Sequence, residues 1–123
     1  MSDDLRRVCA IVDTREAPRF DFDSTLLSST DRSELDQLGK CMTTGPLAGK
    51  NVDLVGRTDP RGEAEYNMTL GARRAQAVEH YLAQLGVAAN RLPTTSRGAL
   101  DARGYDEGTW AADRRVDLRL AGR

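Results

Sequence analysis

Two side chains of opposite charge offer the clearest chemistry in this sequence. Asp59 follows the apolar run Val52–Val55, which has the pattern of a buried strand, and stands in a polar turn before Pro60. Arg74 lies in a later segment whose apolar residues recur at helical spacing. A carboxylate attracts an ammonium group, and the planar guanidinium of arginine makes two parallel hydrogen bonds to a carboxylate. Together, the two residues can bind a ligand that carries both an ammonium group and a carboxylate.

Each of the two residues also has a purely structural explanation. Asp59 can serve its Asp-Pro turn alone, by accepting hydrogen bonds from backbone N–H groups. Arg74 can pack its aliphatic part against the sheet and extend its charge to solvent, or it can form an ion pair with Asp59. Ligand sites are common just beyond the ends of strands in folds that combine strands and helices, which favours the binding interpretation by analogy.

Several polar residues near this pair can hold or orient a ligand. Asp23 ends a segment of alternating aromatic and polar residues, Thr58 stands in the polar turn, and Asn67 offers both a donor and an acceptor. Residues of these types also favour turns and helix caps, so a structural explanation stays open for each. Arg114 and Arg115 begin the last apolar segment, and the sequence does not distinguish which of them faces the pair.

Composition and motifs argue against several classes of protein. The chain has 18 basic and 19 acidic residues, and its net charge of −1 argues against a nucleic-acid-binding protein. The motifs of nucleotide-binding loops, serine hydrolases and zinc proteases do not occur, and the one histidine, His80, has no metal-binding pattern around it. We therefore expect no enzyme, no metal and no cofactor. Trp110 stands in a segment with several glycines, where packing explains it better than contact with a glycan.

Apolar periodicity predicts the elements that position these residues. We expect strands at residues 19–22, 52–55, 91–96 and 116–120, helices at 29–42 and 69–85, and a long surface loop at 97–112. This order, β-α-β-α-β-β, predicts an α+β fold, a two-layer sandwich with the helices on one face of a small mixed sheet. The first 16 residues are charged and irregular, so we divide the chain into an N-terminal segment, 1–17, and one domain, 18–123.

The spacing Gly56-x-Thr58-Asp59-x-x-Gly62-x-x-x-Tyr66-Asn67, followed by Arg74-Ala75, resembles that of the OmpA-like peptidoglycan-binding domain. Arg57 stands where that family usually has His, and Gly71 stands where Ser is common. Phe20–Ser24 resembles the family's first strand and Asp113–Asp117 its closing strand, so the resemblance covers about residues 18–121. The residues that match the signature in register are Gly56, Thr58, Asp59, Gly62, Tyr66, Asn67, Leu70, Arg74, Ala75, Val78, Tyr81 and Leu82.

The resemblance implies non-covalent binding of peptidoglycan through the meso-diaminopimelate of its stem peptide. A protein of this kind anchors the outer membrane, or another envelope complex, to the cell wall. By resemblance, Asp59 contacts the amine of diaminopimelate and Arg74 contacts its carboxylate. The residues expected to complete the ligand contacts are Asp23, Thr58, Asn67 and Arg114. A second hypothesis is a protein-interaction or dimerisation module on the same fold, without binding of the glycan peptide.

The resemblance also implies a periplasmic location, with attachment to the outer membrane by a region absent from this chain and with envelope proteins as further partners. No apolar run in the sequence approaches the roughly 18 residues of a membrane helix, and the N-terminus lacks a signal-peptide pattern. We therefore expect no direct membrane insertion by this segment. Cys9 and Cys41 can form a disulfide, or each can be a free thiol. The oxidising periplasm that the resemblance implies favours the disulfide.

Overall fold

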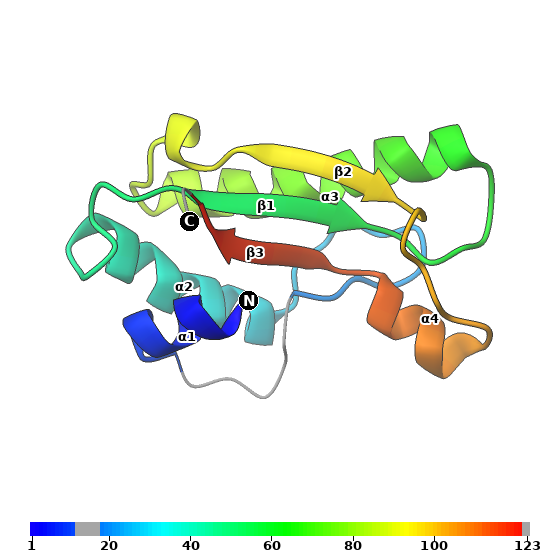
Figure 1. The fold of residues 1–123 in the computed structure, drawn as a ribbon, viewed down its shortest axis with the longest axis horizontal. Coiled ribbons are helices and arrows are strands. Elements are labelled where there is room, and N and C mark those ends of the chain that lie inside the picture. Colours follow the sequence, from blue (N-terminus) through cyan, green and yellow to red (C-terminus); the bar gives the residue numbers. More distant parts are fainter. Residues whose placement is uncertain (12–17, 122–123) are drawn as a thin grey trace.

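The computed structural model describes residues 1–11 and 18–121, and it shows four α-helices and three strands in that part of the chain. Figure 1 shows their arrangement, with the sheet in front of the longest helix. In chain order the elements are α1 (Asp3–Cys9), α2 (Ser29–Thr43), β1 (Val52–Arg57), α3 (Ala64–Gln84), the 3₁₀ turn η1 (Ala89–Arg91), β2 (Thr94–Gly98), α4 (Glu107–Asp113) and β3 (Val116–Leu120).

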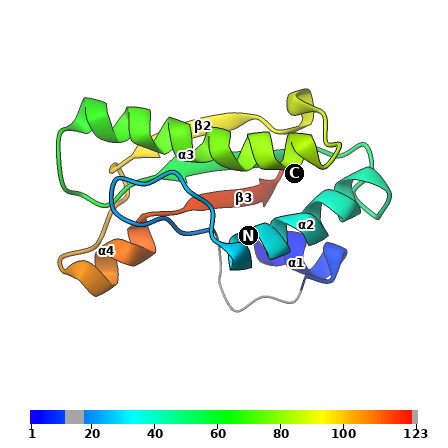
Figure 2. The same cartoon turned by 180° about the vertical axis from the view of Figure 1, so that it is seen from behind.

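The sheet is mixed, and β1 lies between the other two strands. β1 runs parallel to β2 and antiparallel to β3, and Leu54 pairs with Thr94 on one side and with Leu118 on the other. Leu54 and Leu118 are fully buried, because helices cover their side of the sheet. Figure 2 shows α2 and α3 together on that face. The α+β fold class expected from the sequence is confirmed.

The apolar core lies between the sheet and the two long helices. Leu35, Leu38 and Met42 on α2 and Val78 and Leu82 on α3 are all fully buried, as their helical spacing predicts. None of the helices in the described part of the chain is both long and apolar enough to cross a membrane.

The backbones of α3 and β1 approach each other closely because both elements have a glycine at the contact. A Cβ atom on Gly56 would lie 1.7 Å from the carbonyl oxygen of Gly71, so any side chain there would push the helix away from the strand. The contact places the turn that follows β1 beside the N-terminal half of α3. It therefore brings Asp59, beyond the strand, and Arg74, on the helix, to the same pocket.

The first strand expected at residues 19–22 is wrong. Arg19 forms an isolated bridge with the residue before β3, and the chain then leaves the sheet. Phe20 is buried whereas Phe22 is 59% exposed, so the two aromatic residues do not share a buried face as strand alternation requires. Asp23 has a φ of 56°, in the left-handed region, and this conformation belongs to a turn. The segment is a loop beside the sheet.

Two further boundaries differ from those expected. α3 begins at Ala64 and not at residue 69, so Tyr66 and Asn67 lie on the first turns of the helix instead of in a linker. β2 covers Thr94–Gly98 and not 91–96, because the chain forms a 3₁₀ turn just before it.

A short helix, α4, takes the place of the last part of the expected loop. The Asp106 side chain accepts a hydrogen bond from Thr109 N at 3.0 Å, and the Thr109 side chain accepts one from Asp106 N at 3.2 Å. This capping box satisfies N–H groups that a helix of only seven residues would otherwise leave without partners.

The N-terminal residues also form a helix, α1, where an irregular segment was expected. Leu5 is fully buried and joins the apolar core together with Ile11. The expected disulfide is present between Cys9 and Cys41, whose Cα atoms are 5.6 Å apart. The domain boundary expected after residue 17 lies among residues outside the described part of the chain, and it stays a prediction.

Candidate functional site

Five of the six residues expected to contact a ligand line one pocket. The pocket lies between the loop before α2, the turn after β1 and the N-terminal half of α3, and its volume is about 90 Å³. The fold thus joins three segments that are far apart in the sequence. The lining residues are Phe22, Asp23, Thr58, Asp59, Arg61, Gly62, Tyr66, Asn67, Leu70 and Arg74.

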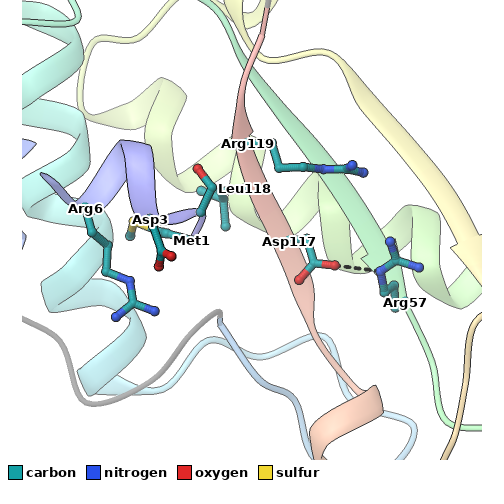
Figure 3. Close-up of a pocket in the computed structure, with 8 residues that line it drawn as sticks. Met1, Asp3, Arg6, Arg57, Asp117, Leu118 and Arg119 are labelled. Atoms are coloured by element: carbon teal, nitrogen blue, oxygen red, sulfur yellow. Dashed lines mark hydrogen bonds and ion pairs between the residues drawn. The ribbon is translucent and has the colours of Figure 1, made fainter. Parts of the chain in front are cut away.

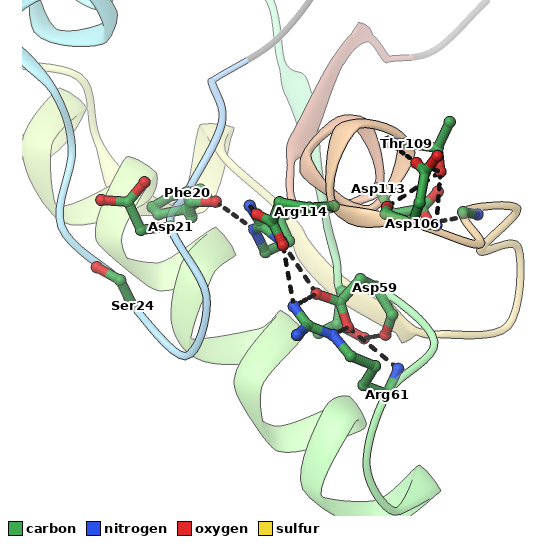
Figure 4. A network of polar contacts seen from close by, with 12 residues as sticks. Phe20, Asp21, Ser24, Asp59, Arg61, Asp106, Thr109, Asp113 and Arg114 are labelled. Atoms are coloured by element: carbon green, nitrogen blue, oxygen red, sulfur yellow. Dashed lines mark hydrogen bonds and ion pairs between the residues drawn. The ribbon is translucent and has the colours of Figure 1, made fainter.

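Asp59 is 4% exposed and accepts hydrogen bonds from two arginines, as Figure 4 shows. Its Oδ2 accepts from Arg61 Nη2 at 2.8 Å and from Arg114 Nη1 at 3.2 Å, and its Oδ1 accepts from the main-chain N of Arg61 at 3.1 Å. Burial alone would raise the pKa of Asp59, but the hydrogen bonds from Arg61 and Arg114 outweigh burial and hold the pKa below its ordinary value. Asp59 is therefore ionised at neutral pH.

Arg74 is fully buried on the face of α3 that packs against the sheet. Its Nε donates to Ser24 O at 2.9 Å, its Nη1 to Arg57 O at 3.1 Å and its Nη2 to Asp21 O at 3.0 Å. Arg74 thus fastens the loop before α2 to the end of β1. Burial, with the charge of Arg114 nearby, lowers the pKa of Arg74 to about 10, so the guanidinium stays protonated at neutral pH.

Arg74 also keeps the capacity to bind a carboxylate. A guanidinium carries five N–H groups, and the three bonds described use one on each nitrogen. Each terminal nitrogen retains one N–H group with no acceptor among the described residues, and Arg74 lines the pocket. The ion pair with Asp59 that could have explained Arg74 structurally does not form. Arg61 and Arg114 are the cations paired with Asp59 in the described part of the chain.

The three polar residues expected to orient a ligand differ in their exposure and in the hydrogen bonds that they already make. Thr58 is buried, and its Oγ1 donates to the carbonyl of the next residue at 3.0 Å. Asn67 is buried too, and its Nδ2 donates to Arg61 O at 2.9 Å. Asp23 is exposed at the rim, where its carboxylate accepts a hydrogen bond from the Tyr66 hydroxyl. Thr58 and Asn67 therefore hold the turn, and Asp23 presents its carboxylate to the opening.

Arg114 lies behind Asp59 and is not among the lining residues. Its Nη2 donates to Glu107 Oε1 at 2.9 Å, and its Nε donates to a main-chain carbonyl of the loop before α2 at 2.8 Å. Arg115 donates from Nε to Asp117 Oδ1 at 2.9 Å, away from Asp59. Of the two arginines that the sequence leaves equivalent, Arg114 is therefore the one near the pocket. Its direct contact with a ligand stays a prediction.

Arg61 and Phe22 are pocket residues that the sequence reasoning missed. The Arg61 guanidinium lies 4.1 Å from the ring centre of Phe22 and 4.1 Å from that of Trp110. Its side chain is 33% exposed. The Pro-Arg-Gly sequence predicts a turn and gives no sign of this stacking. The lone tryptophan was the available signal, and Trp110 packs on Arg61 from α4.

The charges that line the pocket are balanced. Two carboxylates, Asp23 and Asp59, lie there with two guanidinium groups, Arg61 and Arg74. Such a lining suits a group that carries one positive and one negative charge, because each charge finds an opposite partner. A volume of about 90 Å³ is far below the roughly 300–1,000 Å³ of drug-sized ligand pockets, so the pocket admits only a small terminal group.

A larger hollow, lined by the first residues of the chain and by parts of β1 and β3, differs in its chemistry. It has a volume of about 400 Å³, and Figure 3 shows Arg57, Asp117 and Arg119 among the residues around it. Arg57 Nε donates to Asp117 Oδ2 at 2.7 Å, so these two charges of the hollow already pair with each other. No group of three or more His, Cys, Asp or Glu side chains in residues 1–11 and 18–121 could hold a metal ion. The pocket around Asp59 is therefore the candidate site.

Comparison with known proteins places residues 19–116 on the model of the OmpA family. The chain is 42% identical over 102 residues to the peptidoglycan-associated lipoprotein of Pseudomonas aeruginosa, a match that covers 81% of this chain and 59% of that protein. It is 36% identical over 106 residues to outer membrane protein A of Bordetella avium, covering 84% of this chain and 53% of that protein. The chain thus spans little more than half the length of these curated relatives.

Solved structures share the fold. The crystal structure of the peptidoglycan-associated lipoprotein from Burkholderia pseudomallei has a TM-score of 0.79 at 35% identity, covering 86% of this chain and 90% of that one. The C-terminal domain of Helicobacter pylori MotB has a TM-score of 0.76 at 20% identity, covering 89% and 86% of the two chains. The second likeness concerns the fold alone.

Proposed function

The chain belongs to the OmpA family, and on that basis we propose that it binds peptidoglycan without a covalent bond. The observation that carries the proposal is that Asp59 and Arg74, opposite in charge and both buried, line one small pocket. Burying charge is costly, so buried ionic groups that retain free hydrogen-bonding capacity indicate a ligand. The names of relatives and of a solved structure, which refer to peptidoglycan, support this choice of ligand.

The part of the ligand that enters the pocket is the meso-diaminopimelate of the stem peptide. Its free end is an amino-acid head group, with an ammonium and a carboxylate on one carbon, and its size and charges suit the pocket. Asp59 holds the ammonium group, and the two remaining N–H groups of Arg74 bind the carboxylate. Asp23 and Asn67 orient the head group, and Arg114 keeps Asp59 in place.

This action contains no chemical step, so the chain is a binding domain and not an enzyme. We extend the proposal to the whole protein, which would work in the periplasm and link the outer membrane, or an envelope complex with its own proteins, to the cell wall. The relatives that are named as a lipoprotein and as an outer membrane protein support this extension.

A titration with a muropeptide that contains meso-diaminopimelate tests the proposal. NMR or calorimetry should show saturable binding in the micromolar to millimolar range, which corresponds to roughly −4 to −8 kcal/mol. Asp59→Asn keeps the side-chain shape but removes the charge, and it should weaken binding about 10-fold or more. Asp101→Asn, at an exposed carboxylate outside the pocket, is the matched control and should bind like the wild type.

A lysine-containing muropeptide tests the carboxylate end of the site, because lysine lacks the second carboxylate. It should bind more weakly than the diaminopimelate form. If folded wild-type protein binds neither muropeptide, the proposal is wrong, and the protein-interaction module becomes the better hypothesis.

A further inference from the structure

We propose that Arg61 is an internal competitor of the ligand, because its guanidinium occupies the position at Asp59 that a ligand ammonium group needs. This inference rests on the proposed function and adds a condition to it. A ligand enters only by displacing Arg61, so the pocket accepts amino-acid head groups with a free ammonium and excludes head groups whose amine is acylated.

The contacts of Asp59 show that Arg61 occupies the position that a ligand ammonium group would take. Arg61 donates from Nη2 to Asp59 Oδ2 at 2.8 Å and from Nε to Oδ1 at 3.3 Å, so its guanidinium faces both carboxylate oxygens. Arg114 approaches the same carboxylate from behind, at 3.2 Å. Since Arg61 lines the pocket and Arg114 does not, Arg61 is the cation that stands between Asp59 and an entering ligand.

The side chain of Arg61 can leave without undoing the turn. Its main-chain N also donates to Asp59 Oδ1, at 3.1 Å, and that bond does not depend on where the guanidinium lies. The side chain is 33% exposed, whereas those of Asp59 and Arg114 are 5% and 6% exposed. Arg61 is thus the most exposed member of the group, and Arg114 continues to compensate the Asp59 charge during the exchange.

A second carboxylate, which also pairs with Arg114, lies within reach of the displaced guanidinium. Glu107, in the first turn of α4, has its Oε2 3.9 Å from Arg61 Nη2, and its side chain is 68% exposed. A small movement towards Glu107 keeps the cation near the Trp110 ring, 4.1 Å away in this structure. The free energy lost when the Arg61–Asp59 ion pair breaks is therefore partly recovered near Glu107. A weakly binding ligand can then drive the exchange.

The exchange explains which head groups are excluded. A ligand ammonium restores the second cation of the buried Asp59, so the charge pairing is kept. An acylated amine that displaces Arg61 brings no charge and leaves Asp59 with one cation, which is costly for a buried carboxylate. Binding of such a ligand breaks the Arg61–Asp59 ion pair and forms no new ion pair in its place.

The test compares wild type with Arg61→Met, which keeps a long aliphatic side chain but removes the charge. The ligands are a muropeptide with free meso-diaminopimelate and the same muropeptide with its pocket-facing amine acetylated. Arg61→Met should bind the free form about fivefold more tightly, because an ion pair with one partly exposed partner no longer has to be broken. Arg97→Met, at a partly exposed arginine outside the pocket, is the matched control and should not change affinity.

Trp110, the single tryptophan of the chain, gives a readout of the exchange itself. Because the Arg61 guanidinium packs on its ring, the free muropeptide should change the fluorescence of the wild type. The acetylated muropeptide should leave that fluorescence unchanged. Arg61→Met should already differ from the wild type without ligand and should respond less when the free form binds.

The outcomes separate this inference from the function on which it rests. Wild-type binding that becomes weaker or stays equal in Arg61→Met leaves the proposed function standing and overturns the role of Arg61 as a competitor. Equal binding of free and acetylated muropeptides by the wild type overturns the exclusion of acylated amines. Absence of binding by both folded proteins overturns the proposed function and this inference together.

Discussion

Two clusters of arginine and aspartate lie near the end of β1, and water reaches them to different extents. The pocket cluster consists of Asp59, Arg61, Arg74 and Arg114. The open-face cluster consists of Arg57, Arg97, Asp101 and Asp117. Asp59, Arg74 and Arg114 are at most 5% exposed, whereas the open-face side chains are 12–44% exposed. Arg57 follows Gly56, whose backbone contacts α3, so its side chain points to the opposite face of the sheet.

The difference shows how burial changes what the same two residue types require. On the open face each charge has both water and a partner, so an individual pair contributes little. Around Asp59, Arg74 and Arg114 water is largely excluded, and a buried charge needs partners to be tolerated. The N–H groups of Arg74 that lack an acceptor among the described residues are therefore available to a ligand.

The largest effect that would distinguish the clusters is expected from Arg74→Met. It removes three hydrogen bonds to main-chain carbonyls and frees the loop before α2 from the end of β1. We expect the free energy of unfolding to fall by about 3–5 kcal/mol, the range for breaking a buried ionic network. Urea denaturation measures the change. Arg73→Met, at the exposed neighbouring arginine, is the control and should change little.

A smaller effect is expected from acid. The pKa of Asp59 is lower in the folded chain than its ordinary value, so the stability that Asp59 contributes is complete above about pH 4 and is lost as pH falls through the folded pKa. The melting temperature of the wild type should fall steeply below that pH, and that of Asp59→Asn should fall less.

Asp101→Asn tests the corresponding effect of acid on the open-face cluster. Hydrogen bonds from Arg97 and Arg57 also hold the pKa of Asp101 below its ordinary value, but water screens that pair. We therefore expect its melting profile between pH 2 and 6 to follow the wild type more closely than that of Asp59→Asn does. The reverse order would contradict the distinction between the clusters.

A still smaller effect is expected from Glu107→Gln, which removes the second carboxylate near Arg61 together with its ion pair to Arg114. The affinity for a diaminopimelate muropeptide should fall about two- to threefold, because the displaced guanidinium loses an exposed partner. Calorimetry against the wild type measures the change. An unchanged affinity would show that Arg61 does not move towards Glu107.

The smallest effect is expected from Arg97→Gln on the open face. Arg97 donates to Asp101, and both side chains are more than 40% exposed. We expect no measurable change in the urea midpoint or in muropeptide affinity. A clear loss of affinity would show that the open face takes part in binding.

The strand, the turn and the long helix that carry Asp59 and Arg74 could be predicted from the sequence. Val52–Val55 is a continuous apolar run, and α3 repeats its apolar residues at helical spacing over several turns. Long periodic segments of this kind define both the element and its buried face. That layout and the resemblance to a known family together predicted that Asp59 and Arg74 lie at the same site, and both line one pocket.

The other walls of the pocket could not be predicted, because their elements are short or irregular. Phe20 and Phe22 have strand spacing, but the turn at Asp23 sends one ring into the core and the other to the surface. α1 and α4 have seven residues each, too few for periodicity to be recognised, and caps together with tertiary contacts stabilise them. The stacking of Arg61 depends on α4 and on this loop, so it was missed as well.

The disulfide between Cys9 and Cys41 has a mechanical consequence. Because it links α1 covalently to α2, a pulling force on the N-terminal residues passes from Cys9 directly to Cys41. This covalent path bypasses the loop residues Phe22 and Asp23 at the pocket. If the domain binds the cell wall as proposed, tension on its N-terminal side would thus enter the core through α2 and not through the loop at the pocket.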